Sequence, residues 1–264
     1  MTALVTTERL GHVAVITLSR PPVNALNDEL IASLDDALSN VLAGHDATVL
    51  HLRSDQKSFC AGADLAAMQA CFATPGGTEA MIATVESMQR LFQRFETAAV
   101  VTIAEIGGAA IGGGLELALA CDLRVAAAEA RLGLTEARLG LLPAAGGTQR
   151  LARLCGPAVA KRLILGAELI DGSEAQRLGL VQWAQPQERL AAWTRELAGR
   201  TAAMPSAALT AIKRCIAAHG DLRRDGFAEE IAATRELYDH PETRRRVSEF
   251  LSKTSTRQDT KELR

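Results

Sequence analysis

The 264-residue sequence is poor in aromatic side chains, with six Phe, two Trp and one Tyr. A protein that reads nucleic-acid bases by stacking usually presents several aromatic rings. A basic footprint is missing as well, since the formal net charge is −2 and the isoelectric point lies near 6.2. Both absences argue against a nucleic-acid-binding protein.

Long apolar runs are also missing. No stretch approaches the roughly 18 uncharged apolar residues that a membrane span needs. Residues 1–5 lack the charged and apolar regions of a signal peptide. The five cysteines include no Cys-x-x-Cys pair, and the five histidines show no ligand spacing. We therefore expect a cytoplasmic protein with no disulfide framework, metal centre or membrane contact.

What remains is a composition typical of a globular domain, with 48% hydrophobic and 23% charged residues. Strand and helix patterns alternate through the first two-thirds of the chain, which favours an α/β core. From residue 188 onward the pattern is almost entirely helical. The sequence predicts an α/β region over residues 1–195 and a helical region over residues 196–264.

Several local signals mark where elements begin and end. Residues 5–18 predict two short strands joined by a turn at 10–12. Asn27 has the residue type and position of a helix N-cap, with two acidic residues in the following turn. A helical stretch from about 64 to 97 is broken at 74–77, where Thr, Pro and Gly cluster.

The densest chemical signal is a glycine triplet, residues 112–114, between a strand and an apolar helix. Bare backbone at a helix start suits an oxyanion or a phosphate, because free amides there carry partial positive charge. The spacing fits neither a Walker loop nor a dinucleotide-binding loop. A tight packing turn would place glycines here equally well.

Two carboxylates stand in apolar surroundings. Glu116 lies within the Leu- and Ala-rich helix that follows the triplet, and Glu136 is bracketed by Gly, Leu and Pro. Burial raises the pKa of a carboxyl group and makes it a candidate acid or base. Two such groups can divide the acid and base roles if they converge. The alternatives for Glu116 are a polar stripe on its helix and a pair with an arginine.

A second loop, residues 57–65, consists mostly of small residues and leads into a helix beginning near Asp64. It exposes a further set of backbone donors. Two donors, one from each of the two loops, are what an oxyanion hole requires.

Taken in order, these segments resemble the crotonase family, that is, the enoyl-CoA hydratase/isomerase superfamily, over nearly the whole chain. The matching motifs are Asn24-Ala25-Leu26-Asn27, Phe59-x-Ala61-Gly62-Ala63-Asp64-Leu65, Gly112-Gly113-Gly114-x-Glu116-Leu117-Ala118, Cys121-Asp122, Glu136-x-x-Leu139-Gly140-Leu141-x-Pro143-x-x-Gly146-Gly147-Thr148-Gln149-Arg150-Leu151 and Ala175-x-x-x-Gly179-Leu180-Val181.

The resemblance implies a crotonase-like spiral of ββα units that carries an acyl-CoA site, followed by a C-terminal α-helical region. Residues 196–264 would then serve oligomerisation and cover the coenzyme A. The expected assembly is a homotrimer or a dimer of trimers. No separate cofactor is expected, because coenzyme A is part of the substrate.

The resemblance also assigns roles to residues. The backbone amides of Ala63 and Gly113 would form the oxyanion hole, and Glu116 and Glu136 would be the catalytic glutamates. The positions expected to bind substrate are Ala61, Gly62, Asp64, Leu65, Gly112, Pro143 and Gly147. Lys57 and Lys253 are candidates for contacts with the coenzyme A phosphates, although both have the character of ordinary solvated lysines.

With both glutamates present, the implied reaction is that of an enoyl-CoA hydratase of fatty-acid or related acyl-CoA breakdown. It adds water across the 2,3-double bond through an enolate, with Glu136 as the expected proton donor. The alternatives are an enoyl-CoA isomerase or another acyl-CoA lyase of this family, and a non-catalytic paralogue that binds acyl-CoA or RNA. A serine protease of the broader fold lacks support, since no Ser and His stand in the expected settings.

Some positions depart from the family's pattern. Gly107 replaces a common Asn and Glu105 a small apolar residue, both expected beside the active-site loop. Arg246 stands where a Gly is frequent. Residues 200–264 carry 13 Lys or Arg against 10 Asp or Glu, including the arginine runs 223–224 and 244–246. These runs fit either a solvated helix face or an anion site.

Overall fold

A computed structural model describes the backbone of residues 3–262 and the side chains of residues 3–252. The strands are β1 (Val5–Leu10), β2 (Val13–Leu18), β3 (Val49–Ser54), β4 (Val101–Ile106), β5 (Ala110–Ile111), β6 (Leu123–Ala127), β7 (Arg131–Gly133), β8 (Ile170–Asp171) and β9 (Trp183–Gln185). The helices are α1 (Asp28–Ala43), α2 (Leu65–Phe72), α3 (Gly77–Thr97), α4 (Gly113–Leu119), the 3₁₀ helix η1 (Glu136–Leu139), α5 (Gly147–Leu165), α6 (Gly172–Arg177), α7 (Gln187–Ala202), α8 (Ser206–Ala218), α9 (Gly226–Asp239) and α10 (Pro241–Glu262).

The larger sheet of the described chain has six strands in the order β1-β2-β3-β4-β6-β9. β1 and β2 form an antiparallel hairpin, and every later neighbour is parallel. β2 is buried along its whole length. Parallel strands covered on both faces by helices read as continuous apolar runs, which explains the composition of these segments.

A smaller sheet, β5-β7-β8, runs beside the first. Isolated bridges extend its pattern, because Leu26 pairs with Ala63 and Cys60 pairs with Ala110. Successive turns of the chain thus contribute a long strand to one sheet, a short extended segment to the other, and then a helix. This is the predicted spiral of ββα units.

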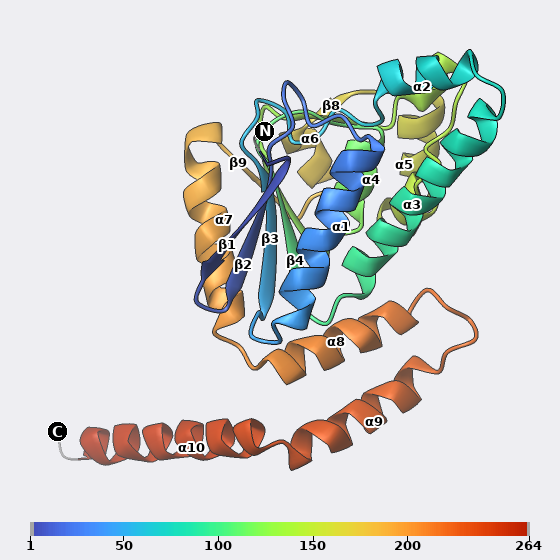
Figure 1. Cartoon of the computed structure of the whole chain (residues 1–264). Coiled ribbons are helices and arrows are strands. Elements are labelled where there is room, and N and C mark those ends of the chain that lie inside the picture. Colours follow the sequence, from blue (N-terminus) through green and yellow to red (C-terminus); the bar gives the residue numbers. More distant parts are fainter. Residues whose placement is uncertain (1–2, 263–264) are drawn as a thin grey trace. The chain divides into compact units, whose positions relative to one another are not determined.

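Helices cover both faces of the larger sheet. Figure 1 shows α7 along one side of this sheet and α1 along the other. The core includes the fully buried rings of Phe59, Phe92 and Phe95. The last two anchor α3 firmly to the rest of the unit.

Most local predictions are confirmed. The turn between β1 and β2 holds Gly11 at φ +59°, a conformation that glycine adopts at little cost. The Asn27 side chain caps α1 by accepting the Leu30 N–H at 3.0 Å, and Asp64 caps α2. The break between α2 and α3 spans residues 73–76 and overlaps the predicted 74–77. The short strands β5, β7 and β8 carry too few residues to show a period in sequence.

The chain divides into two compact units, Met1–Ala203 and Met204–Arg264. The division falls after α7 rather than at the predicted residue 195. The reason is that α7 packs on β3, β4 and β6 and so belongs to the first unit. The oligomerising and coenzyme A-covering roles of the C-terminal region stay predictions.

In the second unit, α9 packs with α8 and with α10. The arginines of both basic runs lie within ion-pair distance of acidic side chains of the same unit. The pairs are Arg223–Asp221, Arg224–Glu229, Arg244–Asp239, Arg245–Glu249 and Arg246–Glu242. This pairing favours a solvated, internally neutralised helix surface over a free anion site.

Within the described residues, no helix combines the length and apolar character that crossing a bilayer requires.

Candidate active site

The glycine triplet forms the start of α4 and turns the chain sharply. Gly112 has φ +52° and ψ −126°, which only glycine adopts readily. Its N–H donates to the Gly133 carbonyl at 2.9 Å, which ties α4 to β7. All residues of α4 are buried, so Glu116 enters the protein interior with the helix, and it is only 2% exposed.

The Glu116 carboxylate is held by the start of another helix. Its Oε1 accepts the Gly147 N–H at 2.7 Å, and Gly147 is the first residue of α5. Burial raises the pKa of Glu116 to about 7, against the opposing effect of the Gly147 amide and reinforced by the charge of Glu136. Glu116 therefore changes charge near neutral pH.

Glu136 opens η1 and reaches the same region. Its Oε1 lies 2.8 Å from the position that a Cβ on Gly112 would occupy. Its Oε2 is buried and has no hydrogen-bond partner among the described residues. Burial raises the pKa of this carboxyl as well. The structure thus brings together the two glutamates that the sequence singled out, with one carboxylate held by a backbone N–H and one with an unpaired oxygen.

Ala63 and Gly113 come from the two loops and lie close together. A Cβ on Gly62 would lie 3.4 Å from the Gly113 nitrogen, and one on Gly113 would lie 3.8 Å from the Ala63 nitrogen. Within the described part of the chain, neither the Ala63 nor the Gly113 N–H donates to a protein acceptor. Asp64, by contrast, donates its N–H to Leu26 at 2.9 Å. Two unpaired amides side by side have the composition of an oxyanion hole.

Glycine is required where these loops meet. Gly62 has φ +93°, and a Cβ there would lie 2.8 Å from the Ile111 carbonyl oxygen. A Cβ on Gly147 would lie 2.9 Å from both Glu116 Oε1 and the Cβ of buried Pro143. Gly112, Pro143 and Gly147, three of the positions expected to bind substrate, therefore lie around the two carboxylates.

Asp64 caps α2 and also pairs with an arginine to which the sequence did not link it. Its carboxylate accepts the N–H groups of Ala66 and Ala67 at 3.1 Å each and pairs with Arg20 at 2.7 Å. These contacts hold the pKa of Asp64 below its usual value, with the Ala67 amide contributing most. Its neighbour Leu65 is 54% exposed. Ala61 donates its N–H to the Val23 carbonyl at 3.0 Å, so its backbone is part of the loop's framework.

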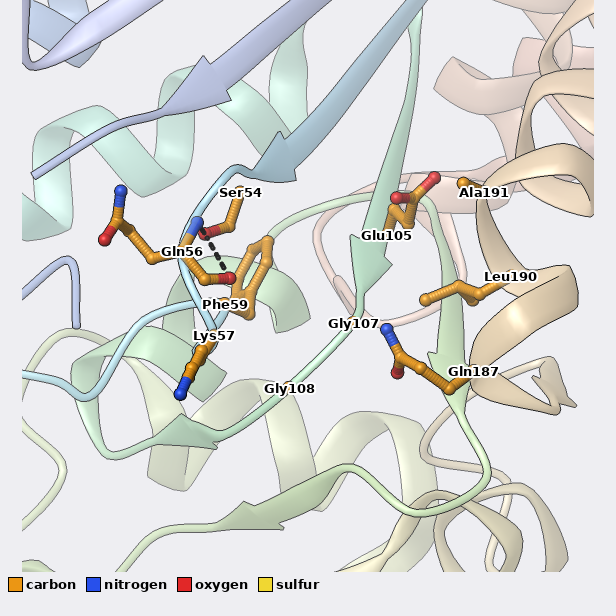
Figure 2. A pocket seen from close by; sticks show the side chains of 10 residues that line it. All are labelled: Ser54, Gln56, Lys57, Phe59, Glu105, Gly107, Gly108, Gln187, Leu190 and Ala191. Carbon is orange, nitrogen blue, oxygen red and sulfur yellow. Dashed lines mark hydrogen bonds between the residues drawn. The ribbon is translucent and has the colours of Figure 1, made fainter. Parts of the chain in front are cut away.

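The two lysines proposed for phosphate contacts differ in what the structure shows. Lys57 is exposed and lies at a cavity of about 340 Å³ that also contacts α7 (Figure 2). The side chain of Lys253 lies outside the described residues. Both phosphate roles stay predictions.

Glu105 lines the same cavity as Lys57 and Phe59 of the loop, but its side chain points toward α7. Figure 2 shows its side chain near Ala191 of α7, on the far side of the cavity from Lys57. Its Oε2 lies 3.0 Å from His51 Nε2, an ion-pair distance, although the angles are too bent for a hydrogen bond. Gly107 lines the same cavity. Neither departure from the family's pattern touches the two glutamates.

Sequence reasoning did not identify Arg150 as a residue that acts on Glu116, nor Glu96 as the partner of Arg150. Arg150 lies in the first turns of α5, and its charge lowers the pKa of Glu116. It pairs with Glu96 of α3 at 2.9 Å. Arg150 belongs to the motif that begins at Glu136, but nothing in the sequence links it to Glu96, which stands 54 positions earlier. Among side chains 3–252, no group of three or more His, Cys, Asp or Glu is placed to hold a metal ion.

Comparison with known proteins agrees with this geometry. The family model described as enoyl-CoA hydratase/isomerase matches residues 8–258. The chain therefore belongs to the enoyl-CoA hydratase/isomerase family, as the sequence motifs predict.

Individual relatives support the same family. Crotonyl-CoA hydratase of Syntrophomonas wolfei is 36% identical over 195 residues, 73% of each chain. The mouse mitochondrial protein named enoyl-CoA hydratase domain-containing protein 2 is 42% identical over 199 residues, which span 74% of this chain and 66% of the mouse protein. The crystal structure of an enoyl-CoA hydratase from Bacillus anthracis superposes with a TM-score of 0.87 at 32% identity, covering 95% of this chain and 96% of that one. The predicted crotonase fold is confirmed.

Proposed function

We propose that the protein is an enoyl-CoA hydratase that adds water across the 2,3-double bond of a 2-enoyl-CoA thioester. One observation carries the proposal: the buried Glu116 and the half-buried Glu136, whose Oε2 is inaccessible to solvent, share a site with the two unpaired amides of Ala63 and Gly113. Hydration needs both carboxylates, because a water must lose a proton while the substrate gains one.

The two amides supply the electrostatic part of the mechanism. In the proposed complex they donate to the thioester oxygen. Negative charge develops on that oxygen only as the enolate forms, so fixed donors stabilise the transition state more than the bound substrate. Losing one such donor typically costs on the order of 3–4 kcal/mol.

Glu116 is suited to act as the base. Its Oε1 already accepts an N–H from Gly147, and accepting a hydrogen bond favours the charged carboxylate. In the proposed step Glu116 takes a proton from water while the water oxygen bonds to Cβ. A pKa of about 7 keeps an appreciable fraction of this group charged at neutral pH.

Glu136 is suited to act as the acid. Burial raises its pKa, and its Oε2 meets no protein donor that would favour the charged form. In the proposed step it delivers its proton to Cα as the enolate collapses. The proton gained by Glu116 and the one lost by Glu136 balance, and exchange with solvent restores the starting state. Coenzyme A enters as part of the substrate, and the scheme uses no other cofactor.

We also propose that the chain assembles as a homotrimer or a dimer of trimers. Support comes from exposed apolar side chains on α8 and α9, among them Ile212, Ile216, Phe227 and Ile231, since large exposed apolar residues in one region mark an interaction surface. Light scattering during size-exclusion chromatography measures the mass directly, and a monomer would contradict the proposal.

The test of the reaction is an absorbance assay of the conjugated thioester with crotonyl-CoA and longer 2-enoyl-CoAs. We expect turnover by the wild type and a fall of roughly 10²–10⁴-fold in both Glu116→Gln and Glu136→Gln, because each removes a proton-transfer group. Glu129→Gln, an exposed carboxylate elsewhere, is the control and should keep full activity.

Two outcomes would contradict the hydratase proposal. The wild type could leave every 2-enoyl-CoA unchanged, or Glu116→Gln could keep full activity. Formation of the conjugated chromophore from a 3-enoyl-CoA, without hydration of 2-enoyl-CoAs, would instead identify an isomerase.

A further inference from the structure

Arg150 forms a bridge between helix α3 and the segment that holds Glu116. Its Nε and Nη2 donate to Glu96 Oε2 at 3.0 and 2.9 Å. Its Nη1 donates to the Ala145 carbonyl at 2.9 Å. The Arg150 side chain is only 12% exposed. A planar guanidinium with several fixed donors can hold two partners at once in one geometry, which a lysine cannot.

The turn before α5 is shaped to receive this guanidinium. Gly146 has φ +107°, and a Cβ there would lie 2.2 Å from Arg150 Nη1. Any side chain at this position would therefore displace Arg150 from Ala145. The glycine allows the charged group to lie directly against the backbone of the turn.

Helix α3 contacts the same turn at a second point. Gln89 Nε2 donates to the Ala144 carbonyl at 2.6 Å. Gln89 and Glu96 are seven residues apart, so they lie on the same face of α3, two turns from each other. Phe92 and Phe95 lie next to this face of α3, and both rings are fully buried in the core. A rigid helix thus contacts the turn through two side chains.

The turn carries the backbone groups that act on Glu116. The Gly147 N–H donates to its Oε1 at 2.7 Å, and the Ala145 amide also favours its charged form. Ala145 is the residue whose carbonyl Arg150 holds. A displacement of this turn would therefore remove amide donors from a buried carboxylate.

We propose that Arg150, held by Glu96, is a positioning residue that keeps the amides of Ala145 and Gly147 on the Glu116 carboxylate and so keeps this group charged for catalysis. The catalytic part rests on the proposed function, in which Glu116 is the base. The positioning part does not depend on the reaction.

The sign of the effect follows from the groups that face Glu116. Glu136 from η1 raises its pKa, whereas Arg150 and the two amides of the turn lower it. Loss of Arg150 removes a positive charge and loosens the amides, and both changes raise the pKa further. A variant without Arg150 should therefore hold its proton on Glu116 at neutral pH.

The first experiment titrates Glu116 directly, by carbon-13 NMR of the full-length protein labelled at the glutamate δ-carboxyl and assigned with Glu116→Gln. We expect Arg150→Gln to raise the titration midpoint of Glu116 by about one pH unit or more. Glu96→Gln should shift it in the same direction by less. Arg153→Gln removes an exposed arginine one turn further along α5 and is the matched control, which should titrate like the wild type.

The second experiment measures the pH dependence of hydration. In Arg150→Gln, kcat at pH 7 should fall at least fivefold, KM should stay within about twofold, and activity should recover toward higher pH as Glu116 becomes charged. Arg150→Lys keeps the charge but not both contacts, so we expect its kcat at pH 7 to lie between those of Arg150→Gln and the wild type.

Each outcome decides one statement. If Glu116 titrates in Arg150→Gln as in the wild type, the positioning proposal is wrong whatever the enzyme's reaction. If the midpoint shifts but the wild type hydrates no enoyl-CoA, the proposed function fails and the positioning role stands. Should Arg150→Gln fail to fold, Glu96→Gln keeps the test open, and an unshifted Glu116 there would contradict the proposal.

Discussion

Arg20 donates to the Asp64 carboxylate at 2.7 Å and thereby joins the segment before α1 to the residue that follows the Ala63 amide. The same guanidinium donates to the Ala25 carbonyl at 2.8 Å. Asp64 in turn caps α2. One half-buried pair therefore sets the direction in which the chain leaves the proposed oxyanion hole.

Substitution of Asp64 should separate its two tasks. Asp64→Ala loses the helix cap and the partner of Arg20, and we expect a loss of about 2 kcal/mol in the free energy of unfolding. Asp64→Asn keeps a good capping residue and should lose about half as much. Urea unfolding of both variants measures this. Equal losses in the two variants would show that the cap contributes nothing.

The raised pKa of Glu116 predicts a pH-dependent effect on stability. The shift from 4.5 to about 7 corresponds to about 3 kcal/mol at 1.36 kcal/mol per pKa unit. Between these two pH values the native state binds more protons than the unfolded state, so the stability contributed by this group falls as the pH rises. Glu116→Gln removes that loss. We expect the variant to gain up to about 3 kcal/mol over the wild type at pH 8 relative to pH 4.5.

Urea unfolding at both pH values measures this gain, and Glu129→Gln serves as the exposed control. Only the change between the two pH values reports the charge, because any difference in packing is present at both. An equal stability difference at pH 4.5 and pH 8 would contradict the raised pKa.

Two glycines in helices should respond oppositely to alanine. In Gly147→Ala the new Cβ would approach Glu116 Oε1 and Pro143 within 2.9 Å. We expect a loss of about 1–3 kcal/mol from overpacking and at least a tenfold fall in kcat. Gly199 in α7 has nothing within 4 Å of its Cβ position, so Gly199→Ala should gain about 0.5–1 kcal/mol. Thermal unfolding and the hydration assay test both, and an active, stable Gly147→Ala would show that the carboxylate is loosely held.

The thiol of Cys60 should resist modification in the native protein. It is fully buried, its Sγ lies 3.0 Å from the Asn24 carbonyl oxygen, and burial raises its pKa to about 12. Since the thiolate is the reactive form, iodoacetamide at pH 8 should leave Cys60 unmodified. Half-buried Cys71 and Cys215 provide internal comparisons by peptide mass spectrometry. Modification of Cys60 as fast as Cys71 would mean that this loop opens readily.

The features that were predictable from the sequence are those set by near neighbours. Asn27 and Asp64 cap the helices that begin beside them, and the apolar neighbours of Glu116 predict its burial. In each case the interacting groups lie within a few residues, where residue type and spacing are informative.

The features that escaped prediction join distant parts of the chain. Gly147 donates to a carboxylate 31 residues earlier, and His51 meets Glu105 only because β3 and β4 pair in the observed register. A polar residue within each of two apolar strands was the available signal for the second pair. Whether the two side chains face α7 depends on the face of the sheet that each residue occupies. A shift of one residue in the register reverses that face.

The glycines between the two loops limit how this protein can evolve. A Cβ on Gly108 or Gly114 would lie 1.9 Å from the Lys57 carbonyl oxygen or 2.1 Å from that of Cys60. The two loops contact each other through their backbones. A substitution there therefore has no side chain by which it could shift the positions of the amide donors in small steps. New substrate preferences in descendants of this sequence must therefore arise elsewhere, and the exposed Leu65 and Phe72 of α2 can change without disturbing that contact.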